Sequence, residues 1–384
     1  MKKCRCFEPV TAFFERNNVL CVVSRWIVGL VFLFSSFVKG VDPMGTMFKV
    51  EDYMMNWEFL GSNFEWAIPF AGFLAVALIC AEFLVGVMLI FNAFRIFASW
   101  MLVLMMAFFT CTTFFDAVTN LVDDCGCFGD AIKLTNWETF WKNVVLDVFT
   151  VVIFVSRRQR LRRRPLRDSI IVAVSLLLMV FFCVYNIVHE PVIDFRPWKV
   201  GEKAVVEQEE STVIRYVNRK TGEAQELRYR TGEWNAEWNV YNEDTATWRF
   251  DTSWYVPPFE VKAAGFSMMD EGNSDHAIEM LTSEEGTLIV TVYDLDAVDE
   301  QAASDMRKAI DQARDQDLTA VVLSSDPDRI PGWLLDHNMA DVEYYLTDAT
   351  AIKTILRGNP GYLFVRGGMV VDKGRDMEEL KIEN

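Results

Sequence analysis

Cys125 and Cys127 are separated by a single glycine in the segment DDCGCFGD, residues 123–130. Two residues of chain reach at most about 7 Å, and a disulfide needs Cα atoms about 4.4–6.8 Å apart. The two thiols can therefore bridge each other only in a small ring, with Gly126 supplying the backbone freedom. Strained, exposed disulfides are oxidising and labile. The spacing favours a redox-active pair.

Two other interpretations stay open for this segment. The pair can be a passive staple of the loop, or two thiolates can bind a metal, although no further soft ligand lies nearby because the histidines are residues 189, 276 and 337. Asp123, Asp124 and Asp130 surround the pair, and their negative charge disfavours a nucleophilic thiolate. These acids suit a dithiol that receives an oxidising disulfide.

Three carboxylates occur within apolar stretches of the chain. Glu82 and Asp147 fall near the middle of such stretches, and Asp116 lies close to an end. Oxidation of a dithiol releases two protons, so these groups can conduct protons or border a quinone. The competing interpretation is that each is protonated and hydrogen-bonded to a neighbouring helix. Cys111 can act as a resolving thiol or as a small apolar filler.

The elements that position these residues are apolar runs long enough to span a bilayer. About 20 apolar residues cross a hydrocarbon core of about 30 Å. Five stretches qualify, and we predict a helix for each: 19–38, 66–91, 96–118, 137–155 and 169–188. No small-residue cleavage site follows the first, so it is not a signal peptide.

Arginine and lysine predict how the spans are oriented. Residues 157–167 hold seven arginines between the fourth and fifth spans, and Lys2, Lys3, Arg5 and Arg95 fall on the same side. The positive-inside rule places this side in the cytoplasm. We therefore expect a multi-pass inner-membrane protein with a cytoplasmic N-terminus and a periplasmic segment after His189.

Charge divides the chain of 384 residues into two parts. Residues 1–189 carry 17 Lys and Arg against 15 Asp and Glu, whereas residues 190–384 carry 20 against 39. An acidic excess of this size repels phosphates and excludes nucleic acid as a partner. The bilayer and a periplasmic protein are the partners that we expect.

The acidic part begins with β structure and continues with alternating strands and helices. Residues 212–217 and 224–230 alternate with period two around a turn, as in a hairpin. The following tryptophans either close a small β core or form a sugar-binding surface: Trp234, Trp238, Trp248 and Trp254. From residue 257 the pattern predicts strand, helix, strand, helix and a closing hairpin, typical of an α/β sandwich.

This last order, with Pro360 opening the hairpin, resembles the thioredoxin fold, in which that proline is cis and borders the active site. Residues 259–261 resemble the entry strand of thioredoxin-like domains of the TlpA type. The resemblance covers about residues 257–384. The loop that would carry Cys-x-x-Cys reads DLDAVDE at 294–300, and all eight cysteines precede residue 184. The resemblance therefore implies a redox-inactive docking domain.

The first four spans resemble the MauE/DoxX group of small membrane proteins over about residues 18–156. The matching elements are Gly29, KGVDP at 39–43, MFKVEDY at 47–53, Glu82 and CGCFG at 125–129. MauE-like proteins are associated with disulfide formation in periplasmic partners, so the resemblance implies that Cys125 and Cys127 are the working pair. By analogy alone, the vitamin K epoxide reductase family links a quinone to disulfide formation.

We therefore predict an α-helical membrane bundle, four MauE/DoxX-like helices and a fifth span, followed by an extracytoplasmic α/β thioredoxin-like domain. The predicted parts are residues 1–156, 157–189, 190–256 and 257–384. The expected function is thiol-disulfide exchange between Cys125–Cys127 and a periplasmic partner, with no metal and with a quinone as one possible acceptor. The alternative is a non-catalytic membrane scaffold whose acidic domain docks another protein.

Overall fold

The computed structural model describes residues 18–56, 65–120, 126–157, 164–189, 191–230, 241–263 and 265–381. Residues 1–195 and 196–384 form two compact units. Cys125, Asp123, Asp124, Trp234 and Trp238 lie outside the described residues, as does most of the arginine run.

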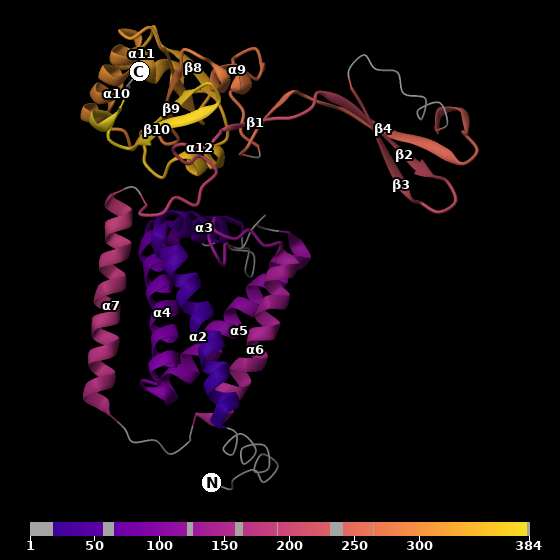
Figure 1. Ribbon diagram of the computed structural model, residues 1–384. Coiled ribbons are helices and arrows are strands. Elements are labelled where there is room, and N and C mark those ends of the chain that lie inside the picture. Colours follow the sequence, from indigo (N-terminus) through magenta and orange to yellow (C-terminus); the bar gives the residue numbers. More distant parts are fainter. Residues whose placement is uncertain are drawn as a thin grey trace. The chain divides into compact units, whose positions relative to one another are not determined.

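The first unit is helical (Figure 1). Its long helices are α2 (Asn18–Val41), α4 (Ala71–Phe91), α5 (Arg95–Thr119), α6 (Asn136–Ser156) and α7 (Pro165–Val188). All five are long and apolar enough to cross a membrane, which confirms the predicted set of helices. The chain is a multi-pass membrane protein. One further helix was not predicted, α3 (Pro43–Asn56), and the predicted span 66–91 begins with the short 3-10 helix η2 (Glu65–Phe70) before α4.

Helices α2, α4, α5 and α6 share one apolar core, formed by side chains such as Phe32, Met88, Leu102 and Ile153. The backbones of α2 and α4 approach closely at two glycines. A Cβ atom on Gly29 would lie 2.9 Å from Ile90, and one on Gly86 would lie 3.0 Å from Leu33. Small residues let the backbones of two membrane helices approach closely. The resulting van der Waals contacts are important because lipid provides no hydrophobic drive for helix association.

A capping box fixes the start of α6. The Thr135 hydroxyl accepts a hydrogen bond from the Glu138 amide, and the Glu138 carboxylate accepts one from the Thr135 amide. Helix α7 packs beside α4 (Figure 1), where Met179 and Cys183 contact Ile79 and Cys80. The capping box therefore defines where α6 begins, and α7 joins the helical unit through α4.

The described residues of the second unit form three sheets. One is a five-stranded mixed sheet with the order β10-β9-β6-β7-β8. Three of its strands are parallel: β6 (Thr287–Val292), β7 (Thr319–Ser324) and β8 (Glu343–Leu346). The other two strands, β9 (Gly361–Arg366) and β10 (Met369–Gly374), form an antiparallel hairpin, and β9 pairs antiparallel with β6. The peptide bond between Asn359 and Pro360, before β9, is cis.

Helices cover both faces of this sheet. Along β6, Leu288, Val290 and Val292 point to one face, against α10 (Glu300–Arg314) and α11 (Ile330–Asp336). Ile289 points to the other face, against α9 (Ala277–Thr282) and α12 (Ala349–Ile355). Successive side chains of β6 therefore point to opposite faces of the sheet and belong to two separate apolar layers. The sequence pattern predicted β6, α10, β7, α11, β9 and β10 but missed α9, β8 and α12.

Two smaller sheets precede the five-stranded sheet in the chain. The predicted hairpin is confirmed: β2 (Ser211–Asn218) pairs with β3 (Ala224–Arg230), and β4 (Trp248–Val256) adds a third strand. The predicted entry strand forms as β5 (Phe259–Val261), but it pairs with β1 (Val205–Glu207) in a separate sheet. Trp248 packs on Tyr241 with ring centroids 5.0 Å apart, whereas Trp254 is 39% exposed and does not close a core.

His276 is expected to make the stability of the second unit depend on pH. Its ring nitrogens lie 3.0 Å from Glu279 Oε2 and 3.2 Å from Asp270 Oδ2. These hydrogen bonds, to Glu279 first, raise the pKa of His276 above 6.5. The stability that they provide is therefore complete below about pH 6.5 and is lost as the pH rises through the raised pKa. Thermal unfolding of the full chain should show this loss, and His276→Gln should reduce the pH dependence. Equal pH dependence in both proteins would contradict this role of the histidine.

Candidate functional site

The described part of the loop before α6 is a glycine turn that docks on the helices. Gly126 and Gly129 have φ values of +63° and +51°, in the left-handed region that favours glycine. The Gly129 amide donates to the Gly126 carbonyl at 3.0 Å. A Cβ atom on Gly126 would lie 3.4 Å from the Lys49 side chain of α3, and one on Gly129 would lie 3.1 Å from Val38 of α2. Larger residues at either glycine would strain the turn.

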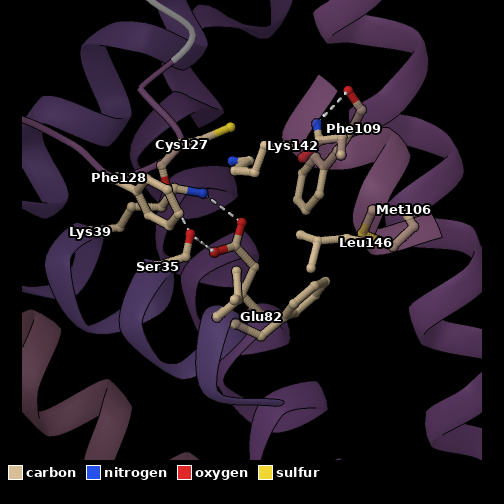
Figure 2. A pocket seen from close by; sticks show the side chains of 12 residues that line it. Ser35, Lys39, Glu82, Met106, Phe109, Cys127, Phe128, Lys142 and Leu146 are labelled. Atoms are coloured by element: carbon tan, nitrogen blue, oxygen red, sulfur yellow. Dashed lines mark hydrogen bonds and ion pairs between the residues drawn. The ribbon is translucent and has the colours of Figure 1, made fainter. Parts of the chain in front are cut away.

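The turn closes a pocket between the four helices, with a volume of ≈ 30 Å³. This volume holds one or two water molecules. Figure 2 shows how side chains from α2, α4, α5 and α6 converge with Cys127 on this space. The residues that line it are Val31, Phe32, Ser35, Lys39, Glu82, Met106, Phe109, Cys127, Phe128, Lys142, Asn143 and Leu146.

An ion pair is buried in the pocket. Lys39 Nζ of α2 lies 2.6 Å from Glu82 Oε1 of α4, and the two side chains are 9% and 2% exposed. Ser35 Oγ lies 3.0 Å from Glu82 Oε2 and 2.7 Å from the carbonyl oxygen of Cys127. One hydroxyl proton serves only one of these acceptors at a time. Ser35 thus connects the buried carboxylate to the backbone of the cysteine.

Lys142 of α6 brings a second positive charge to the pocket. Its Nζ lies 4.4 Å from the centroid of the Phe128 ring, a cation-π distance. In Figure 2 the Cys127 sulfur and the Lys142 nitrogen are turned toward the same space between the helices. In addition to the acidic residues next to the cysteines in the sequence, the pocket that Cys127 lines thus contains Lys142 and the Lys39–Glu82 ion pair.

The other predicted site residues lie outside this pocket. Asp116 is buried and accepts a hydrogen bond from the Tyr53 hydroxyl at 2.5 Å, and Asp147 accepts one from Thr110 at 2.8 Å. Cys111 is exposed on α5. Of the predicted carboxylates in the described residues, the pocket includes only Glu82. Each of these two aspartates thus accepts a hydrogen bond from a neighbouring helix.

Sequence reasoning missed Ser35, Lys39 and Lys142. Lys39 ends an apolar run, where a lysine ordinarily marks the membrane surface. Its pairing with Glu82 joins residues 43 positions apart. Lysine within or at the end of an apolar stretch was the available signal, since an ionisable group at membrane depth requires a partner. Among the residues that the structure describes, no three His, Cys, Asp or Glu side chains form a group that could hold a metal ion.

Comparison of the chain with protein-family models gives a match over its first helices. Residues 16–156 match the family model described as methylamine utilisation protein MauE. These residues form a MauE family domain. The matched range contains α2 to α6, the glycine turn and the whole pocket. Comparisons with curated proteins and with solved structures give no match. The MauE match does not extend to α7 or to the second unit.

Proposed function

We propose that the MauE domain carries out thiol-disulfide exchange through Cys125 and Cys127. The observation that supports this most is the setting of Cys127, which lines one polar pocket with Lys142 and the buried Lys39–Glu82 pair. Positive charge near a cysteine favours the thiolate, the form that attacks a disulfide. A passive staple requires neither a buried ion pair nor a lysine at that position.

The proposed reaction has two balanced halves. First, a partner's two thiols are oxidised to a disulfide while the Cys125–Cys127 disulfide is reduced to two thiols, with a mixed disulfide in between. Second, the two thiols give two electrons and two protons to an acceptor, and a membrane quinone that becomes a quinol is the chemical class that balances this step. The pocket volume of ≈ 30 Å³ suits water rather than a quinone ring. We therefore propose that the quinone approaches from the bilayer.

Water in the pocket would have polar partners on several sides. Ser35, Glu82, Lys39 and Asn143 all line it, and a buried water needs two to four such partners. Protons released by the thiols can pass through water held by these groups to Glu82, while the Ser35 hydroxyl, which contacts both the Cys127 carbonyl oxygen and Glu82, holds the cysteine backbone beside the carboxylate. In this proposal Glu82 and Lys39 are positioning residues for the proton and not nucleophiles.

We further propose that the second unit docks the partner on the periplasmic side. Support for a thioredoxin-like architecture comes from its central mixed sheet with helices on both faces. Asn359 donates to the Asp294 carbonyl at 2.6 Å, and Arg329 forms an ion pair with Asp296 at 2.6 Å. These contacts hold the loop where Cys-x-x-Cys would stand. Because no cysteine follows residue 183, a non-catalytic scaffold is the second candidate function.

The redox state of the pair tests the proposal. In intact membranes, exposed thiols are blocked with a maleimide, disulfides are then reduced, and the new thiols receive a heavier maleimide. We expect Cys125 and Cys127 to move between thiol and disulfide when dithiothreitol or decylubiquinone is added. A Cys111→Ser variant should shift in the same way, and a Cys125→Ser/Cys127→Ser variant should not shift. If Cys125 and Cys127 stay fully reduced or fully bridged under all conditions, thiol-disulfide exchange is refuted and the non-catalytic scaffold is the function that remains.

A further inference from the structure

A second polar pocket lies at the other end of the same four helices. It is formed where α2 and α5 begin and α4 and α6 end, which in Figure 1 is the end of the bundle away from α3. Its lining residues are Cys21, Arg25, Met88, Leu89, Asn92, Arg95, Ala98, Ser99, Ile153, Ser156 and Arg157. None of them belongs to the pocket beside Cys127.

Three guanidinium groups converge in this pocket from three different segments. Arg95 donates to the Ser156 carbonyl at 3.0 Å, and Arg157 donates to the Phe154 carbonyl at 2.5 Å while stacking 3.5 Å from the Phe154 ring centroid. Arg25 Nε is buried and has no hydrogen-bond partner among the described residues. Two arginines are thus held by backbone oxygens, and a buried donor of the third is unsatisfied.

The described lining contains no carboxylate to balance this charge. The nearby acidic group is Asp168, whose Oδ1 pairs with Arg167 at 3.0 Å and whose Oδ2 accepts from the Phe94 amide at 3.3 Å. The amino ends of α2 and α5 and the carboxyl ends of α4 and α6 meet at this end of the bundle, so their partial charges oppose one another and the positive charge of the pocket comes from the guanidinium groups. Such a site attracts an anion.

The depth of the pocket indicates which anion. It lies at the ends of membrane-spanning helices, where Trp26 and Trp100 are 46% and 49% exposed, as in an interfacial aromatic belt. Lipid phosphates occupy this level, and basic pockets between helices bind such headgroups. Arginine presents a fork of donors that matches phosphate oxygens. The volume of ≈ 10 Å³ admits about one oxygen atom, the remainder of the group staying at the surface.

We infer that this pocket binds a phosphate group through Arg25, Arg95 and Arg157, with one phosphate oxygen inserted between the helices. The phosphate comes either from an anionic lipid headgroup or from a free phosphate ion. This inference is independent of the thiol chemistry proposed above, because the two pockets share no residue.

Binding to the full chain in detergent tests the inference. The probes are dioctanoyl phosphatidylglycerol, inorganic phosphate and dioctanoylglycerol, which lacks a phosphate, and dissociation constants are measured by native mass spectrometry or thermal shift. We expect the phosphatidylglycerol to bind and dioctanoylglycerol not to bind. Arg25→Gln should weaken binding about tenfold, since a charge-assisted hydrogen bond is lost. Binding of inorganic phosphate with similar affinity would identify the free ion as the source.

Arg164→Gln is the matched control. Arg164 precedes α7, is exposed and does not line the pocket, so its replacement should leave binding unchanged. If Arg25→Gln does not fold, Arg157→Gln should weaken phosphate binding to the same extent. Arg25→Lys should keep the fold but bind more weakly, because lysine lacks the forked donors of the guanidinium group. Binding of no phosphate probe, or equal losses in Arg25→Gln and Arg164→Gln, would overturn the inference.

Discussion

Replacing Cys127 by serine is expected to abolish the proposed oxidation of dithiols. A serine hydroxyl forms no disulfide, so the loop pair can neither accept electrons from a partner nor form the mixed disulfide. Vesicles that contain the full chain should oxidise a fluorogenic dithiol peptide in the presence of decylubiquinone. With Cys127→Ser the rate should fall at least about 100-fold, to the rate of vesicles without the protein. Cys125→Ser should give the same result.

The control for this experiment is Cys111→Ser. Cys111 is the exposed cysteine of α5 and does not line the pocket, so its loss should leave the rate unchanged. Thermal unfolding of each variant shows whether the helical unit is intact. A Cys127→Ser protein that is folded and still oxidises the peptide at the wild-type rate would refute thiol exchange by this pair. Loss of activity in Cys111→Ser as well would restore the resolving role considered from the sequence.

Breaking the buried ion pair is expected to have the largest effect on stability. Lys39→Met leaves the Glu82 carboxylate at 2% exposure without its cation, and an uncompensated buried charge costs roughly 3–5 kcal/mol. Glu82→Gln leaves the lysine in the same condition. The double variant Lys39→Met/Glu82→Gln removes both charges and should recover most of the lost stability. The free energy of unfolding of the wild type, both single variants and the double variant is measured in mixed micelles, and the four values give the coupling energy of the pair.

Asp147→Asn provides the comparison within the same membrane domain. Asp147 is half-buried and accepts a hydrogen bond from the neutral hydroxyl of Thr110 at 2.8 Å. The amide of asparagine can accept the same hydrogen bond, so the cost should be smaller, about 1 kcal/mol. A double variant at Lys39 and Glu82 that is as unstable as either single variant would show that the pair acts through packing and not through its charges.

The same ion pair has a role in the proposed chemistry that stability alone does not reveal. The double variant retains Cys125 and Cys127 but lacks the Glu82 carboxylate, the group proposed to receive the protons, and its Lys39 partner. Its dithiol oxidation should therefore be slowed while the thiols remain able to bridge. This separates a positioning role of Glu82 and Lys39 from a structural one.

Much of the architecture was predictable because it depends on local patterns. Five apolar runs give five helices, since only a helix satisfies all its backbone hydrogen bonds within one segment in lipid. Alternation in residues 212–217 and 224–230 predicts the β2–β3 hairpin, whose register follows the turn. The elements that were missed, such as β8 (Glu343–Leu346) and α12 (Ala349–Ile355), are short, so their patterns contain too few residues to distinguish them from loops.

The sequence by itself determined the membrane spans, the acidic second half and the one-residue spacing of Cys125 and Cys127. Only the tertiary structure decided what surrounds Cys127. Ser35 reaches the Cys127 carbonyl across 92 positions of chain, and Lys39 meets Glu82 across 43. No periodicity encodes such contacts, because they arise when separate helices pack side by side and a buried charge must find its partner there.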